Sequence, residues 1–308
     1  MNAWNVIFTT DFAFTVFRVT TPILLTALGA MISRRAGIMN ISLEGIMLVA
    51  ALFGVVGSAY TQSVWIGVLL AVVSGVLLSM VFAYFTLQLK SDLILTGIAL
   101  NLFASGGTVF ILTVLCGDKG VSTSLNSLVI PSVSIPLLKD IPVLGAILSG
   151  HNILTYVSLL CVVLVYILIN KTPMGLRIRS VGENPDAAES VGISVLKTRF
   201  IALIFTGVLA GLGGAYMSMG YVSWFARDMA AGRGFMALSA QNLGNGTPIG
   251  TFLASFIFGI ADALSSTLQV LSIPAEFIQM IPYLTTIIGL ILFAAARKSQ
   301  IKRARAKL

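Results

Sequence analysis

Long runs of apolar residues, separated by short polar stretches, make up most of the 308-residue chain. A helix needs about 20 residues to cross the hydrocarbon core of a bilayer, and runs of that length recur along the sequence. Because a segment inside a bilayer must pair its own backbone groups, these runs predict helices. Runs such as Val64–Leu87 lack the alternation of a membrane β-barrel strand. We therefore expect an all-α integral membrane protein.

The pattern predicts a single transmembrane domain, residues 1–308, built as a polytopic bundle of about nine spanning helices. The predicted spans are Thr15–Ser33, Ile38–Tyr60, Val64–Leu89, Asp92–Leu115, Asn152–Asn170, Phe200–Gly220, Phe235–Leu243, Thr251–Leu271 and Phe277–Ala296. The run Phe235–Leu243 is the weakest, because its length covers only about half of the hydrocarbon core. We expect it to be a broken or re-entrant segment that its neighbours shield from lipid.

Composition supports the membrane class, with 57% hydrophobic and 10% charged residues and a mean hydropathy of +1.00. Lysine and arginine accumulate in cytoplasmic loops, so their distribution predicts orientation. With the C-terminus inside, the basic residues left outside are Arg18, Lys119, Lys139, Arg227 and Arg233. We therefore expect the N-terminus out and the C-terminus in. The predicted connections are a cytoplasmic loop 171–199, an external loop 117–150 and a basic cytoplasmic tail 297–308.

The net charge of +8 comes largely from that tail, which favours attraction to anionic membrane lipids over nucleic-acid binding. Cys116 and Cys161 are too few and too far apart for a disulfide scaffold, and His151 has no companions for a metal site. The sequence has no phosphate-binding loop and no nucleophile elbow. We expect no enzyme activity and no cofactor, so any ATP hydrolysis must take place on a partner chain.

The longest polar interruption, Lys171–Arg199, contains a short predicted helix at Pro185–Val191. Asn184 suits the capping position, and Pro185 suits the first helical position. Asp186 complements the helix dipole, and Gly192 suits the terminating position. This helix is too short and too polar to span a membrane.

On the predicted helix, Ala187, Ala188 and Val191 share a small apolar face, whereas Asp186 and Glu189 point elsewhere. Such a face suits insertion into a groove on a soluble partner. The alternative interpretation is a solvated connector that only joins two spans. Spacing alone leaves both interpretations open.

The loop resembles the cytoplasmic coupling segment of permeases from ATP-binding-cassette (ABC) importers, in the branch of ribose, branched-chain amino acid and nucleoside permeases. The residues that carry the resemblance are Arg179, Gly182, Asn184, Ala187, Ala188, Gly192 and Ile193. The resemblance implies an all-helical permease that contacts a separate ABC ATPase subunit. The implied contact residues are Glu183, Asn184, Pro185, Asp186, Ala187, Ala188, Glu189 and Gly192.

Two further segments resemble the nucleoside group of bacterial permeases in particular. The first is Arg35–Gly45, and the second is Gly232–Ala240, followed by Gly244 and the turn Pro248–Gly250. Ser42 replaces a usual glycine, and Gln241 and Asn242 stand where aliphatic residues are common. The resemblance implies a bacterial cell membrane location and a second homologous permease subunit, expected as a heterodimer. It also implies an extracytoplasmic solute-binding lipoprotein that delivers a small-molecule solute.

Polar residues within or beside the spans are candidates for the solute path. Glu44 is costly in lipid and should face protein or water, with an ion pair to Arg34 or Arg35 as the structural alternative. Asn40 is able to cap the same helix. Asn101 is a buried amide that either lines the path or forms an interhelical hydrogen bond.

Four residues near the weak seventh span complete the candidate path. Trp224 and Phe225 either belong to an interfacial aromatic belt or stack on a nucleobase. Gln241 and Asn242 are able to bond to ribose hydroxyls beside the broken span.

The predicted function is the permease subunit of an ABC importer that forms half of the path for a nucleoside. Permeases for simple sugars or branched-chain amino acids are the main alternatives. An ion-coupled secondary transporter would need a buried acid, for which Asp262 is the candidate, and a channel would need no partner.

Overall fold

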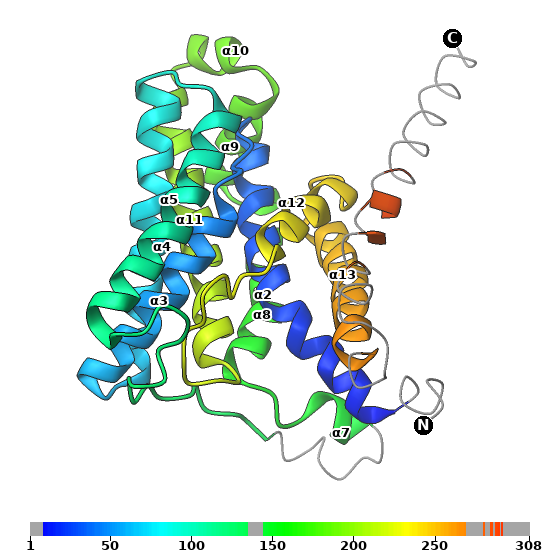
Figure 1. Cartoon of the computed structure of the whole chain (residues 1–308). Helices are drawn as coiled ribbons and strands as arrows, with labels where there is room; N and C mark the ends of the chain where they lie inside the picture. The colour runs from blue at the N-terminus through cyan, green and yellow to red at the C-terminus, as the bar shows by residue number, and fades with distance from the viewer. Residues whose placement is uncertain are drawn as a thin grey trace.

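The computed structural model describes residues 9–134, 144–268, 280, 284–285, 287–289 and 291 (Figure 1). The helices are α2 (Thr10–Arg35), α3 (Leu43–Thr61), α4 (Val64–Ala83), the π-helix η1 (Tyr84–Gln88), α5 (Leu93–Cys116), α7 (Leu144–Leu148), α8 (Ile153–Lys171), α9 (Pro173–Glu183), α10 (Pro185–Ser190), α11 (Val195–Met219), α12 (Arg233–Leu243) and α13 (Pro248–Leu268). Within these ranges, β-pairing is limited to the isolated bridges Val121–Ala226 and Ser132–Asn152. The predicted all-α class is confirmed for this part of the chain.

In the described part of the chain, 7 helices are long and apolar enough to cross a membrane. They are α2, α3, α4 continued by η1, α5, α8, α11 and α13. The predicted seventh span is α12, whose 11 residues extend only about 16 Å. The predicted ninth span, Phe277–Ala296, lies mostly outside the described residues. The chain is therefore a multi-pass helical membrane protein, and the count of nine and the orientation stay predictions.

Helix α11 lies inside the bundle and packs against α2, α3 and α4 (Figure 1). Its hydroxyl groups bond to carbonyls of neighbouring helices, with Thr206 donating to Gly29 at 2.8 Å and Ser218 donating to Ala51 at 2.8 Å. In an apolar medium such side chains find partners on adjacent helices. These bonds fix the position of α11 relative to α2 and α3.

Glycines allow α4 and α11 to approach until their backbones touch. A Cβ atom on Gly75 would lie 2.7 Å from the carbonyl oxygen of Gly207 and 3.0 Å from the Cα of Gly211. Neither distance leaves room for a side chain. Gly207 and Gly211 thus allow the close packing of α4 and α11.

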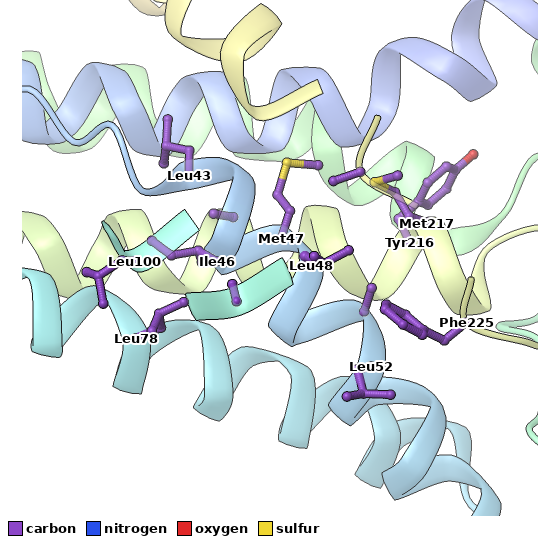
Figure 2. Close-up of a cluster of buried hydrophobic side chains, with 14 of the residues drawn as sticks. Leu43, Ile46, Met47, Leu48, Leu52, Leu78, Leu100, Tyr216, Met217 and Phe225 are labelled. Atoms are coloured by element: carbon purple, nitrogen blue, oxygen red, sulfur yellow. The ribbon is translucent and has the colours of Figure 1, made fainter. Parts of the chain in front are cut away.

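The largest apolar cluster surrounds α3 (Figure 2). Most of its members come from α3, α4, α5, α11 and the segment after α11. The side chains labelled in Figure 2 are Leu43, Ile46, Met47, Leu48, Leu52, Leu78, Leu100, Tyr216, Met217 and Phe225. The cluster connects the two halves of the chain, because residues after Met219 pack against helices that precede Cys116.

The chain between α11 and α13 forms a broken span. Residues 220–232 contain no helix, α12 follows, and a short turn leads into α13. Helix α12 packs against α2, α3 and α13 (Figure 1). A half-length helix at membrane depth requires such neighbours, because lipid offers no partners for the free backbone groups at its ends. The expectation of a shielded, broken seventh span therefore agrees with the packing of α12.

Candidate functional site

The polar loop between α8 and α11 folds into helices α9 and α10 at one end of the bundle (Figure 1). The side-chain Oδ1 of Asn184 accepts a hydrogen bond from the N–H of Ala187 at 3.0 Å, so Asn184 caps α10 as predicted. Pro185 opens the helix, and Gly192 beyond its end is left-handed with φ 83°. The helix ends at Ser190, one residue before the predicted end.

Helix α10 turns most of its side chains away from the rest of the protein. Ala188 is 3% exposed and packs inward. Asp186, Ala187 and Glu189 are exposed, and Val191 is 73% exposed. The predicted apolar face is thus divided, because Ala188 contacts the protein's own loop while Ala187 and Val191 remain open to a partner.

Helix α9 joins α10 to the end of α2. Ile178 on α9 is fully buried, and Gly182 lies so close to the backbone carbonyl of Arg35 that any Cβ atom there would clash. A second contact comes from α11, where Nε of Arg199 donates to the carbonyl of Ala36 at 3.3 Å. The loop that carries α10 is therefore packed against the bundle rather than loosely tethered to it.

A cavity of about 180 Å³ lies between this loop and the end of α12. The residues around it are Arg34, Arg35, Arg179, Gly182, Glu183, Asn245 and Gly246. Across it, Nε of Arg35 donates to the carbonyl of Gly246 at 2.6 Å. Arg35 thus contacts both the loop before α10, through Gly182, and the turn after α12.

The carboxylate of Glu44 holds the other end of α12. Its Oε1 accepts from the N–H of Gly232 at 2.7 Å, and its Oε2 accepts from the N–H of Gly234 at 2.7 Å. A carboxylate at this position satisfies free N–H groups and complements the helix dipole. Glu44 therefore bonds to the backbone at the start of α12, whereas Arg35 bonds to the carbonyl of Gly246.

Two predicted path residues shape the entry to α3. Asn101 on α5 accepts from the N–H of Gly45 at 2.8 Å and donates to the carbonyl of Ile41 at 3.0 Å. The side-chain Oδ1 of Asn40 accepts from the N–H and the hydroxyl of Ser42, at 3.0 and 2.6 Å. Asn101 thus makes the interhelical contact that was its alternative, and Asn40 stabilises the turn before α3.

The four residues near the broken span fall into separate surroundings. Phe225 is fully buried in the α3 cluster, and Trp224 is partly buried. Gln241 is fully buried and donates to Oδ1 of Asn242 at 3.3 Å, while its own Oε1 is buried with no hydrogen-bond partner in the described structure. The arrangement does not gather them into one pocket, and their role in a solute path stays a prediction.

An ion pair that sequence reasoning missed lies beside α12. Nη2 of Arg233 contacts Oδ2 of Asp262 on α13 at 2.9 Å, and the two side chains are 19% and 15% exposed. The topology prediction placed Arg233 outside, and Asp262 stood as a lone acid. The sequence did contain a signal for this ion pair. A charged residue within an apolar segment is costly unless a residue of opposite charge pairs with it, and Arg233 and Asp262 are two such residues.

Glu44 and the Arg233–Asp262 pair thus hold the N-terminal end of α12, and Arg35 holds the turn after its C-terminal end. Comparison with known proteins agrees with this architecture. The chain is 36% identical over 284 residues to the nucleoside ABC transporter permease protein NupC of Lactococcus lactis, with 89% of each chain covered. It is 36% identical to the guanosine ABC transporter permease protein NupQ of Bacillus subtilis, with 87% of each covered.

A solved structure, PsaBC from Streptococcus pneumoniae in complex with Fab, shares the fold. Its TM-score is 0.54 at 13% identity, with 93% of this chain and 94% of that chain covered. The family described as the permease component of the branched-chain amino acid transport system matches residues 12–295. The chain therefore belongs to this family of transport-system permease components.

Proposed function

We propose that this protein is the membrane permease subunit of an ABC importer for nucleosides, and that a separate ATPase subunit drives it through α10. The solute class is supported by the similarity to the permeases named for nucleosides and guanosine. The chain carries no site for ATP on this proposal and moves its solute by changing conformation.

The observation that carries the coupling role is the exposure of α10. It is capped by Asn184 and packed through Ala188, yet it presents Asp186, Ala187 and Glu189 outward. A helix held firmly on one side and free on the other transmits force from whatever binds its free side. The positive residues of loop 171–199 support a cytoplasmic position for α10, where ATP is available.

The contacts of Arg35 give a route from α10 to the broken span. Movement of α9 and α10 shifts Gly182 against the carbonyl of Arg35, whose guanidinium holds Gly246 after α12. Alternating access requires only that the ATPase subunit binds one arrangement of α9, α10 and α12 more tightly when it holds ATP and another arrangement more tightly when it does not. A secondary transporter is disfavoured, because Asp262 is engaged by Arg233.

The complete transporter on this proposal contains further chains in a bacterial cytoplasmic membrane. A second, homologous permease subunit supplies the other half of the path, and an extracytoplasmic lipoprotein delivers the solute. Such a complex is reconstituted in proteoliposomes to test the proposal. Purified delivery protein is first titrated with guanosine, ribose and leucine, and binding of ribose or leucine without guanosine would refute the nucleoside assignment.

The coupling role is tested by changes in α10. Replacing residues 183–192 with a Gly/Ser linker of the same length should abolish ATP-dependent uptake, and uptake that persists would contradict the coupling role. Two adjacent alanines provide a sharper comparison. Ala187→Glu should weaken ATPase binding without lowering thermal stability, whereas Ala188→Glu should lower stability because that side chain is buried.

A further inference from the structure

Two polar side chains from distant parts of the sequence meet on the outer surface of α5. The hydroxyl of Ser105 donates to Oδ1 of Asp228 at 2.9 Å, and Nε of Arg227 lies 3.3 Å from Oδ2 of the same carboxylate. Asp228 belongs to the irregular segment that precedes α12. Neither Ser105 nor Asp228 is among the residues that sequence reasoning assigned to the path.

The depth of this contact is set by α5. Ser105 is near the centre of this 24-residue helix, about 18 Å from either end. In a spanning helix of that length, the centre lies close to the middle of the hydrocarbon core. The irregular segment therefore brings a carboxylate and a guanidinium to the depth where charges are most costly.

Both charges are exposed on the surface of this single chain. The side chains of Arg227 and Asp228 are 64% and 58% exposed. Gly106, next to Ser105, also faces open space, because an added Cβ atom there would meet no atom within 4 Å. Exposure of this kind is incompatible with a lipid-facing surface, since charged groups at mid-membrane face protein or water.

Helix α8 provides a comparison within the same molecule. Around its centre, Leu160, Val163, Leu164 and Ile167 are exposed and apolar, as lipid contact requires, and Tyr166 is exposed as well. Helix α5 is even less buried, with 22% of its most apolar stretch covered against 33% for α8. Leu102 and Phe103 on α5 are likewise exposed and apolar, so the α5 face is distinguished at this depth by the carboxylate and the guanidinium that the segment before α12 brings to Ser105.

A turn at Asp228 connects its carboxylate to α12. Its φ of 53° lies in the left-handed region, which aspartate adopts in turns. The N–H of Ala231 bonds to the carbonyl of Asp228 at 3.0 Å and closes this turn. Four residues further along, Gly232 is held by Glu44, so the carboxylate of Asp228 is connected through a short segment to the N-terminus of α12.

We propose that Asp228, with Ser105 and Arg227, forms a hydroxyl-binding half-site on the water-filled solute path, on the face of α5 turned toward the second permease subunit. This inference rests on the proposed function. An ionised carboxylate is acceptor-only and takes two hydrogen bonds readily, which matches the vicinal hydroxyls of a ribose. Ser105 and Arg227 orient the carboxylate and supply donors for the other sugar oxygens.

Transport by the reconstituted complex tests the recognition of hydroxyls. Asp228→Asn should lower guanosine uptake by about 10- to 100-fold in kcat/KM, the equivalent of one or two charge-assisted hydrogen bonds, and should leave uptake of 2′,3′-dideoxyguanosine near the wild-type value. Asp92→Asn is the matched control, because Asp92 is an exposed acid at the far end of α5 whose Oδ1 accepts from the N–H groups of Ile94 and Leu95 and keeps an equivalent oxygen as asparagine. An equal change for both solutes, or no change, would overturn the assignment. Failure of the proposed function would show instead as a wild-type complex that carries neither solute.

Water access to the site is tested without any solute. In a background with Cys116→Ser and Cys161→Ser, Asp228→Cys should react with a membrane-impermeant thiol reagent at least about tenfold faster than Val163→Cys, which lies at similar depth on α8. Equal, slow reaction at both positions would place Asp228 against lipid or a dry contact and overturn the inference. Because this reaction requires no transport, it separates the location of the path from the identity of the solute.

Discussion

The guanidinium of Arg35 and the carbonyl of Gly246 are joined by a hydrogen bond of 2.6 Å, across 211 positions of sequence. The bond attaches the end of α2, the most buried span of the described chain, to the turn that follows the half-length helix α12. Through Gly182, which lies against the carbonyl of Arg35, the same residue also contacts the polar loop between α8 and α11.

Removal of the Arg35 side chain should uncouple movement of the loop that carries α10 from movement of α12. Arg35→Ala deletes a charge-assisted bond worth about 1.5–3 kcal/mol, so it should lower thermal stability modestly and ATP-driven uptake strongly. Stability is measured by thermal unfolding in detergent, and uptake in proteoliposomes. Lys90→Ala, an exposed basic residue between η1 and α5, is the control. A variant whose uptake falls only in proportion to its stability would show that Arg35 has no coupling role.

Glu44 should be more important for folding than for solute chemistry. Glu44→Ala leaves two N–H groups at the start of α12 without their acceptor and should cost about 2–4 kcal/mol, whereas Glu44→Gln keeps one acceptor and should cost less. Chemical unfolding of the purified protein measures both. Glu189→Gln, on the exposed side of α10, should be neutral. Equal stability of all three variants would contradict the capping role.

Arg233 and Asp262 should show strong coupling in a double-mutant cycle. Each single change to alanine leaves one charge without its partner at 15–19% exposure and should cost about 3–5 kcal/mol. The double variant should be more stable than the sum of the two losses predicts. The adjacent pair Arg227–Asp228, at 64% and 58% exposure, serves as comparison and should couple by less than about 1 kcal/mol. Additive losses at Arg233 and Asp262 would refute the ion pair.

The surroundings of His151 predict that the stability of the folded protein depends on pH. Its ring stacks on Phe14 with centroids 3.9 Å apart, its Nε2 lies 2.8 Å from the carbonyl of Ile147, and Arg18 is nearby. Burial, reinforced by the charge of Arg18, lowers the pKa of His151 below its ordinary value. The folded state therefore favours the neutral ring, so the stabilisation is present above about pH 6.5 and is lost as the pH falls toward the folded pKa.

Thermal unfolding at pH 7.5 and pH 5.5 tests this dependence. The wild type should lose stability at the lower pH, and His151→Gln, which cannot ionise, should lose less. Tyr156 packs edge-on to the same ring at 6.3 Å and is retained in both proteins. Identical pH profiles for wild type and variant would assign the acid sensitivity to other groups.

The length of the apolar runs in the sequence was sufficient to predict the described spans, because a bilayer imposes a minimum length on any helix that crosses it. Local capping chemistry was likewise sufficient for α10, where Asn184 and Pro185 define the start of the helix through bonds within a few residues. These elements depend on nearby sequence alone. They were therefore predictable from the chain.

Contacts between distant residues were not predictable in the same way. Glu44 had neighbouring arginines in sequence, and only the path of the chain shows that backbone N–H groups 188 and 190 positions away satisfy it. Ser105 and Asp228 were missed for the same reason. A serine in an apolar helix and a charge in a loop acquire a common role only when the fold brings them together.

The position of α11 also has a consequence for biosynthesis. Its glycines fit against Gly75, and its Thr206 bonds to Gly29, yet it leaves the ribosome only after α2, α3, α4, α5, α8, α9 and α10. The earlier helices therefore enter the membrane with an unfilled space that a later helix must occupy. Until then, the small-residue surfaces of α2 and α4 lack the helix that covers them in the folded protein, so their close packing forms only late in synthesis.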